Sequence, residues 1–371
     1  MKDINKLITE LGIKSNVINF DSASLGYAPE CVIESLNNYM LRRNLNGSEY
    51  SLYWEKVAKA RELTANRLKA KSEEIFFIQS TSMGLNLAAK SLPLRPGDEV
   101  LVTDMEFPSN IYPWLNLESD GIKVNYVHNH DGVITFDDIV NAITPKTKAV
   151  SVSWVMSTNG LVIDCEKLGN YLHSKGIFFI VDGIQGFGAI PFDVKKCKCD
   201  FFVSGFFKWM MGPDGIAIVY INPDIMDKLS YPWLGWAGMK DKFNYSVFKV
   251  DPANEARRYE TGNMNYSAIQ ALVPLLEMTN PYEEEIYARI KDLVSYLRTS
   301  LKATGKVQVH EPGDQLSGIT FITADDNEKL ISVLKSHSLH FTVRNGVRIS
   351  IHFYNTKDEI DVLVNAVRDE M

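Results

Sequence analysis

The chain alternates short apolar runs with helical patterns between about residues 56 and 250. The runs read EIFFIQ, EVLVTDM, AVSVSWV, IFFIVDG, DFFVSG and GIAIVYI. Each is rich in Val, Ile or Phe and is bounded by Gly, Asp or Ser, which is typical of strands buried on both faces. Because helices alternate with these runs, the pattern predicts an α/β fold with a mostly parallel sheet covered on both sides.

The pattern changes after about residue 266. A long helical stretch from Ser267 to Gly305 precedes two strand-like pieces, SGITFIT and GVRISIHF, and a helix follows at the carboxyl end. This order predicts a second, smaller α+β domain. We therefore expect a large domain over residues 15–255 and a small domain over residues 256–371, with residues 1–14 packing on the small domain.

Composition limits the function classes. The 371 residues are 45% hydrophobic and carry a net charge of −7 without a long Lys/Arg run, so we expect no nucleic-acid partner. No segment approaches the roughly 18 apolar residues of a membrane span. The opening residues, MKDINKLITELGIKSN, lack the apolar core of a signal peptide. Four scattered cysteines fit a reducing compartment, so we expect a cytoplasmic protein without a membrane partner.

An acid and an amine follow two successive strands of the expected sheet. Asp182 ends IFFIVD, with Gln185 three residues later, and Lys208 follows DFFVSG within SGFFKWMMGPDG. Ligands of such sheets bind at the carboxyl ends of the strands. Taken alone, Asp182 is more simply interpreted as the cap of the next turn. Lys208 alone fits a surface lysine whose methylene groups cover apolar residues while its amine reaches water. Together they favour a binding crevice above the sheet.

The apolar surroundings of Lys208 favour Schiff-base chemistry, because burial lowers the pKa of an amine and makes it nucleophilic at neutral pH. Pyridoxal phosphate is the cofactor that needs a lysine, an acid for its pyridine nitrogen and a phosphate site. Asp182 is the right kind of group to hold the pyridine proton. We therefore predict that pyridoxal 5'-phosphate is the cofactor.

A phosphate site is expected in IFFIQSTSMGLNLAAK, where a strand, a polar loop and a helix from near Met83 follow one another. The hydroxyls of Thr81 and Ser82 and the free N–H groups of the helix start form an anion cradle. Thr and Ser are also common helix N-caps without any ligand. Phe107, after EVLVTDM, is placed to stack on a planar ring, or else to anchor its loop on the core.

Several motifs in collinear order resemble the class V aminotransferase group of fold type I pyridoxal phosphate enzymes. This group includes cysteine desulfurases, kynureninases and isopenicillin N epimerase-like proteins. The motifs are FDSASLGYAP, STSMGLNLAA, MEFPSNIYPW, VDGIQG, FKWMMGPDG and VRISIHFYNT. They span residues 20–356, so the resemblance covers nearly the whole chain and implies a fold type I architecture.

The resemblance implies roles for the residues around the cofactor. Lys208 would form the Schiff base, Asp182 would pair with the pyridine nitrogen and Gln185 would reach the ring hydroxyl. Phe107 would stack on the ring, where desulfurases usually have histidine and kynureninase-like members have phenylalanine. Ser157 falls where desulfurases commonly have an asparagine near the ring.

The resemblance also implies roles at both ends of the bound molecules. Thr81 and Ser82 fall on the phosphate-binding loop. Arg348 matches the arginine that holds the substrate carboxylate, although from its residue type alone it fits a charge at a strand edge. Asn263, in YETGNMN, stands where the family has a threonine that reaches across a dimer interface to the phosphate. A homodimer is therefore expected.

Departures from the family narrow the reaction. The eleven residues between Ser336 and Arg348, HSLHFTVRNGV, contain no cysteine, which excludes persulfide formation by the desulfurase route. Phe207 replaces the desulfurase histidine before the lysine. We expect an enzyme that forms a Cα carbanion from an amino acid, leaning to a carbon–sulfur lyase that performs β-elimination on a cysteine-like substrate.

Other outcomes stay open at this stage. Transamination and epimerisation pass through the same carbanion, and a non-catalytic module that binds the cofactor as a sensor is the alternative from another class. HNHD at 128–131 and the pair Cys197 and Cys199 contain metal-ligand types. Neither has a partner pair at useful spacing, so no metal is expected.

Overall fold

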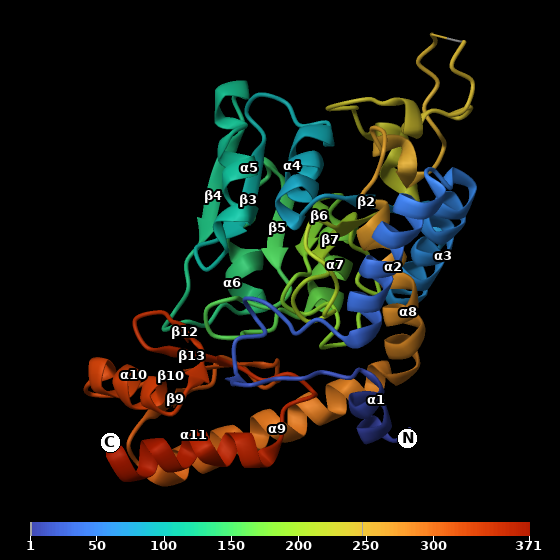
Figure 1. Cartoon of the computed structure of the whole chain (residues 1–371). Coiled ribbons are helices and arrows are strands. Elements are labelled where there is room, and N and C mark those ends of the chain that lie inside the picture. The colour runs from blue at the N-terminus through green and yellow to red at the C-terminus, as the bar shows by residue number, and fades with distance from the viewer. Residues whose placement is uncertain (1, 247) are drawn as a thin grey trace.

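A seven-stranded sheet forms the centre of the computed structural model, which describes residues 2–246 and 248–371 (Figure 1). Its strands are β2 (Ile75–Ile78), β3 (Glu99–Thr103), β4 (Lys123–Val127), β5 (Thr147–Ser153), β6 (Phe178–Asp182), β7 (Phe201–Gly205) and β8 (Ala217–Ile221). They lie in the order β2-β8-β7-β6-β5-β3-β4. Strand β8 runs antiparallel to both of its neighbours, and all other pairings are parallel. The expected mostly parallel α/β sheet is confirmed.

Six of the seven strands coincide with the apolar runs, and the edge strand β4 was not predicted. Its sequence, KVNYV, begins with an exposed lysine and contains half-buried polar residues. Only two of its five residues are buried, so it lacks the apolar run that marks the other strands, including β2, which is buried along its length at the opposite edge.

Alternate strand residues face two separate apolar clusters, one on each side of the sheet. Phe76 and Ile78 belong to the cluster under α4 (Thr81–Ser91) and α5 (Tyr112–Leu115). Phe77 belongs to the larger cluster, which also takes in buried residues of α7 (Cys165–Ser174) and α8 (Tyr266–Thr279). This alternation is the period-two pattern of a strand that is buried on both faces.

The remaining elements of the large lobe surround this sheet. They are α2 (Glu30–Asn46), α3 (Tyr50–Leu68) and α6 (Phe136–Asn141). Helix α8 packs against both α2 and α3, and the three lie together at the right of Figure 1.

A smaller lobe lies below the sheet in Figure 1. It contains α9 (Glu283–Thr304), β9 (Gln308–His310), β10 (Ile319–Thr323), α10 (Asn327–Ser336), β11 (Leu339–His340), β12 (Thr342–Val343), β13 (Val347–Ser350) and α11 (Lys357–Glu370). Four strands form a sheet in the order β12-β13-β10-β9. The amino-terminal segment joins this lobe, because β1 (Ile18–Asn19) pairs with β11 and α1 (Ile4–Glu10) contacts α9.

Two helix boundaries differ from those expected. The long helical stretch after residue 266 is two helices, because Asn280–Tyr282 forms a 3-10 turn around a proline that cannot continue α8. Helix α4 begins at Thr81, not near Met83, and its N-cap is Ser80, whose hydroxyl accepts a hydrogen bond from the Met83 N–H. Among the helices of the described residues, none is long and apolar enough to cross a membrane.

Candidate active site

Asp182 and Lys208 are brought to the same edge of the sheet by adjacent parallel strands. Asp182 is the last residue of β6, and Lys208 follows the end of β7 by three residues. Burial raises the pKa of Asp182 to about 6, although its Oδ1 accepts a hydrogen bond of 3.0 Å from the Ile184 N–H. Burial lowers the pKa of Lys208 to about 8, against the opposing effect of the Asp182 charge. An amine with this pKa is partly neutral near pH 7 and can attack a carbonyl.

Aromatic side chains surround the amine. The Lys208 Nζ lies 6.0 Å from the ring centre of Phe107 and 5.7 Å from that of Phe207. Trp209, the next residue along the chain, is buried, and its indole Nε1 donates a 2.8 Å hydrogen bond to Oε1 of Gln185. The Gln185 amide donates one hydrogen to the Ala23 carbonyl at 3.0 Å, which leaves its second hydrogen for a ligand.

The start of α4 supplies groups suited to an anion. The backbone N–H groups of Thr81 and Ser82 precede the first hydrogen-bonded turn and have no acceptor among the described residues. The Thr81 hydroxyl accepts a 2.8 Å hydrogen bond from the N–H of Gly205, at the end of β7. The Ser82 hydroxyl is 2.8 Å from that of Ser109, in the loop that carries Phe107. Contacts between their segments therefore connect the anion cradle, the Lys208 strand and the Phe107 loop.

Arg348 is a buried residue of β13, not a charge on a strand edge, since only 2% of its surface is exposed. Its guanidinium donates to the Ser157 carbonyl at 2.9 Å, to Asp21 at 3.1 Å and to Ser24 at 2.7 Å. Its buried Nε has no partner among the described residues. Arg348 is therefore held in a fixed orientation by both lobes.

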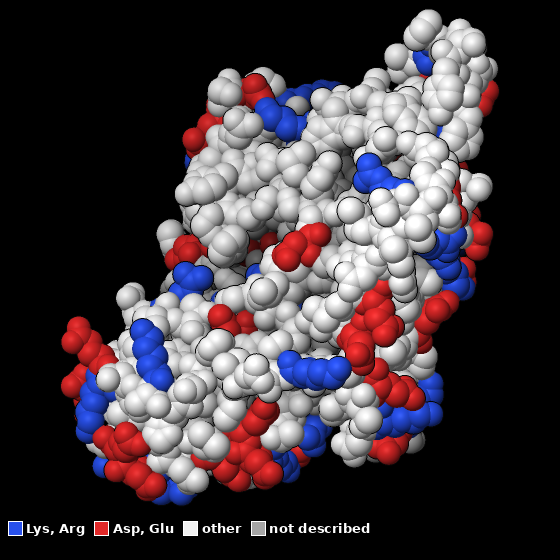
Figure 2. Space-filling view, in the orientation of Figure 1, with Lys and Arg blue, Asp and Glu red and all other residues white. Residues whose placement is uncertain are grey.

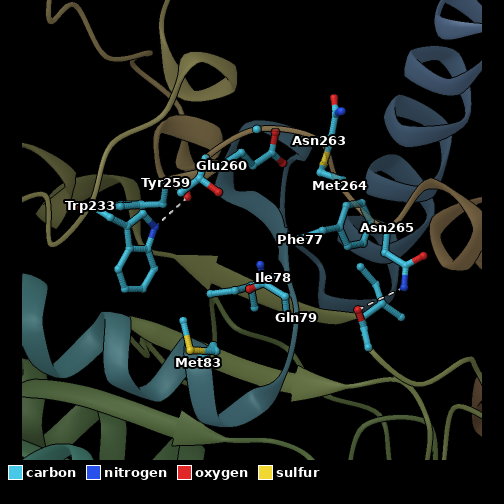
Figure 3. Close-up of a pocket in the computed structure, with 14 residues that line it drawn as sticks. Phe77, Ile78, Gln79, Met83, Trp233, Tyr259, Glu260, Asn263, Met264 and Asn265 are labelled. Carbon is cyan, nitrogen blue, oxygen red and sulfur yellow. Dashed lines mark hydrogen bonds between the residues drawn. The ribbon is translucent and has the colours of Figure 1, made fainter.

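Two predicted residues, Ser157 and Asn263, do not place their side chains among the groups around Lys208 as the other predicted residues do. Ser157 touches Arg348 through its backbone carbonyl. Asn263 is exposed and lines a cavity of about 370 Å³ beside Ile78, Gln79 and Met83, just before and within the start of α4. Figure 3 shows its side chain directed away from these three residues. Within one chain, Asn263 therefore does not join the group around Lys208.

Sequence reasoning missed Glu106, the residue before Phe107. Its carboxylate accepts hydrogen bonds from the side chains of Thr103 and Asn110 and from both the N–H and the hydroxyl of Ser153. Burial raises the pKa of Glu106 to about 7 despite these donors. In EVLVTDMEF, Glu106 stands between a buried strand and an aromatic residue, and this position is the sequence feature that could have indicated a buried carboxylate.

Comparison with known proteins identifies the family. The class-V aminotransferase profile matches residues 18–363, so the chain belongs to this family. A probable cysteine desulfurase of Borreliella burgdorferi is 29% identical over 378 residues, covering 93% of this chain and 89% of that protein. An uncharacterized aminotransferase of Bacillus subtilis, YcbU, is 27% identical over 351 residues, covering 91% of this chain and 90% of that protein.

Solved structures show the same fold. The apo structure of a cysteine desulfurase from Thermococcus onnurineus superposes with a TM-score of 0.89 at 24% identity, covering 100% of this chain and 98% of that chain. The cystine C–S lyase C-DES, in complex with cysteine persulfide, superposes with a TM-score of 0.88 at 19% identity, covering 96% and 98%. The expected fold type I architecture is thereby confirmed, and the chain is a pyridoxal phosphate-dependent enzyme of the class-V family.

The residues at the sheet edge fit this cofactor. Unbonded N–H groups at the start of α4 suit its phosphate. The buried carboxylate of Asp182 suits its pyridine nitrogen, and the Lys208 amine has the lowered pKa that carbonyl chemistry requires. The site thus contains all three kinds of group that the cofactor needs.

Proposed function

We propose that the protein is a pyridoxal phosphate-dependent carbon–sulfur lyase that performs β-elimination on a cysteine-like amino acid. Two observations carry the proposal. Asp182 and Arg348 lie close enough to Lys208 for their charges to act on its pKa, and the segment from Ser336 to Arg348 supplies no cysteine to accept sulfur. The relatives named as desulfurases and the fold shared with a cystine C–S lyase support sulfur chemistry.

Each residue of the site has a proposed task. When bound, the cofactor withdraws electrons from the substrate Cα. Thr81 and Ser82 bind the phosphate, Asp182 holds the pyridine proton, and Gln185 donates its remaining amide hydrogen to the ring hydroxyl. These contacts fix the cofactor in one orientation.

The substrate is oriented and deprotonated by other residues. Arg348 binds the α-carboxylate through its guanidinium, which is already oriented by Ser157, Asp21 and Ser24. Phe107 and Phe207 limit the access of water to Lys208. The Lys208 Nζ, with its pKa near 8, removes the proton from Cα and later delivers a proton to the departing sulfur.

The reaction balances without an external oxidant or reductant. The Cα–H and Cβ–S bonds break. The electron pair of the Cα–H bond forms a Cα–Cβ double bond, and sulfur leaves with the electron pair of the Cβ–S bond. Hydrolysis of the released enamine then gives one pyruvate and one ammonia for each thiol. Stoichiometric pyruvate therefore distinguishes this reaction from transamination and from epimerisation.

The test incubates the holoenzyme with cysteine, S-substituted cysteines and alanine. Pyruvate, ammonia and thiol in equal amounts from the sulfur substrates support the proposal. Pyridoxamine phosphate with a keto acid would show transamination, and loss of optical activity without pyruvate would show epimerisation. Absence of turnover with every substrate, in a protein that binds the cofactor, would favour the sensor alternative.

We further propose that the enzyme is a homodimer and works in the cytoplasm, as the four free cysteines suggest. Helix α2 exposes apolar side chains at helical spacing. These are Ile33, Met40, Leu41 and Leu45, which are 49%, 58%, 55% and 70% exposed. A monomer seldom leaves such a row in water, so it suits a second copy of the chain.

The segment after β8 adds further apolar surface on the same side of the molecule. It extends from the body beside α3, where Trp54 packs edge-on against Trp236 and Phe243 (Figure 1). Tyr245 and Phe248 at its tip are 68% and 101% exposed. In the dimer, Asn263 of each copy would donate to the phosphate in the other.

Sedimentation velocity tests the dimer, with Leu41→Lys as the variant and Lys335→Gln, on α10, as the control. We expect a dimer for the wild type and the control, and a shift towards monomer for Leu41→Lys. A monomeric wild type at micromolar concentration would contradict this part of the proposal.

A further inference from the structure

A second cavity lies between the two lobes. It has a volume of about 470 Å³ and is lined by loops that follow β3, β4 and β5, by residues of β9 and β10 and the segment after β9, and by the turn between β12 and β13. In Figure 2 a hollow separates the upper and lower parts of the molecule, and both positive and negative side chains lie along it. None of the residues proposed to bind the cofactor or the α-carboxylate lines this cavity.

The segments that build the active site also build the wall of this cavity. The loop after β3 carries Phe107 and, three residues earlier, the lining residue Asp104. Thr158, another lining residue, directly follows the residue whose carbonyl binds Arg348. Arg344 lies in the turn that leads into the strand of Arg348. The cavity therefore shares three chain segments with the site of Lys208 and Arg348.

Arg344 is close enough to act on that site electrostatically. After burial, Asp182, Arg348 and Asp21, the charge of Arg344 contributes to the pKa of Lys208, which it lowers. Its own side chain makes no ion pair or hydrogen bond with any described residue. The turn holds it in place through a 2.9 Å hydrogen bond from its backbone N–H to the Gly346 carbonyl.

Two of the three acidic residues that line the cavity already have hydrogen-bond or ion-pair partners. Asp104 accepts hydrogen bonds from the backbone and side chain of Asn129 and pairs with His128. Glu311 pairs with Lys302. Asp131 makes no side-chain hydrogen bond or ion pair with the part of the chain that the structure describes. One cation and one anion, Arg344 and Asp131, thus remain for a ligand.

We propose that this cavity binds the far end of a substrate in which sulfur joins a cysteine to a second amino acid. Arg344 binds the distal carboxylate, and Asp131 binds the distal ammonium group. The inference rests on the proposed function and names its substrate class, a sulfur-bridged bis-amino acid such as lanthionine or cystine. Arg348 binds the near carboxylate, so each end of the molecule has its own charged partner.

Three thioethers separate the two distal contacts. Lanthionine carries both distal charges, S-(2-carboxyethyl)-L-cysteine carries only the carboxylate, and S-propyl-L-cysteine carries neither. Arg344→Gln should raise KM about tenfold for the first two thioethers and not for the third, which corresponds to the loss of one charge-assisted contact. Any change of kcat through the Lys208 pKa should be equal for all three thioethers. Asp131→Asn should raise KM for lanthionine alone, and Asn tolerates the left-handed backbone at this position (φ 53°).

Conservative and distant variants control the experiment. Arg344→Lys should recover part of the lost affinity, because it restores the charge without the fork of donors. Lys335→Gln removes a cation from the same lobe outside the cavity and should change nothing. Equal increases of KM for all three thioethers, or no increase for lanthionine, would overturn the proposal.

A binding measurement keeps this inference separate from the lyase proposal. Calorimetric titration of cofactor-loaded Lys208→Ala with lanthionine and with S-propyl-L-cysteine needs no turnover. We expect tighter binding of lanthionine, and loss of that preference when Arg344→Gln is added. If no thioether is cleaved but the preference is found, the lyase proposal fails and the cavity assignment stands. If thioethers are cleaved without a preference, only the cavity assignment fails.

Discussion

Glu106 should make the stability of the apoprotein depend on pH in a way that Glu106→Gln abolishes. Burial raises the pKa of this carboxyl from its ordinary 4.5 to about 7. At about 1.4 kcal/mol for each pKa unit, the ionised form is disfavoured in the folded protein by about 3 kcal/mol. The folded pKa is the higher one, so the contribution of Glu106 is fully present below pH 4.5 and is lost as pH rises through about 7.

The assay is urea unfolding of both apoproteins at pH 5 and pH 8.5. The glutamine side chain of the variant does not titrate, and its amide places a donor against the Ser153 N–H and the Asn110 amide, so the variant should be less stable at both pH values. The wild type should exceed the variant in free energy of unfolding by about 2.5 kcal/mol more at pH 5 than at pH 8.5. This is less than the full effect of Glu106, because part of that effect is already lost at pH 5. A difference in free energy of unfolding that stays constant, or grows with pH, would contradict the raised pKa of Glu106.

Three further changes test other contacts. Arg348→Gln should raise KM for a carboxylate substrate about 100-fold while cofactor content, read from visible absorbance, changes less than twofold; equal losses would count against its role. Gly84→Ala should destabilise the protein by about 1–3 kcal/mol in urea unfolding, because the new Cβ would lie 2.4 Å from Cγ1 of Val203; an unchanged midpoint would show that α4 can shift. Phe107→Ala should weaken cofactor retention during dialysis, whereas Phe107→Tyr should preserve it; identical retention would remove its stacking role.

The central sheet could be predicted because both its faces are buried. Six mainly apolar runs reflect that burial directly, and they indicate where the strands end. The positions of Asp182 and Lys208 follow from those ends, because adjacent parallel strands deliver their next residues to one edge. Strand β4 lacked the run because only two of its five residues are buried.

The surroundings of Arg348 could not be read from local sequence. Two of its partners, Asp21 and Ser24, are more than 320 residues away along the chain, and Ser157 contributes a backbone carbonyl rather than its side chain. A backbone contact leaves no trace in residue type. The charge balance of the cavity beside it also depends on which acids are already paired, as Asp104 is and Asp131 is not among the residues that the structure describes.

Lys208 is proposed as the amine that bonds to the cofactor. The most direct measurement treats the holoenzyme with borohydride, digests it and locates the added pyridoxyl phosphate mass by mass spectrometry. We expect one labelled peptide, carrying the mass on Lys208, and no label in Lys208→Ala. A label on another lysine, or a Lys208→Ala protein that keeps its yellow colour and full activity, would contradict it.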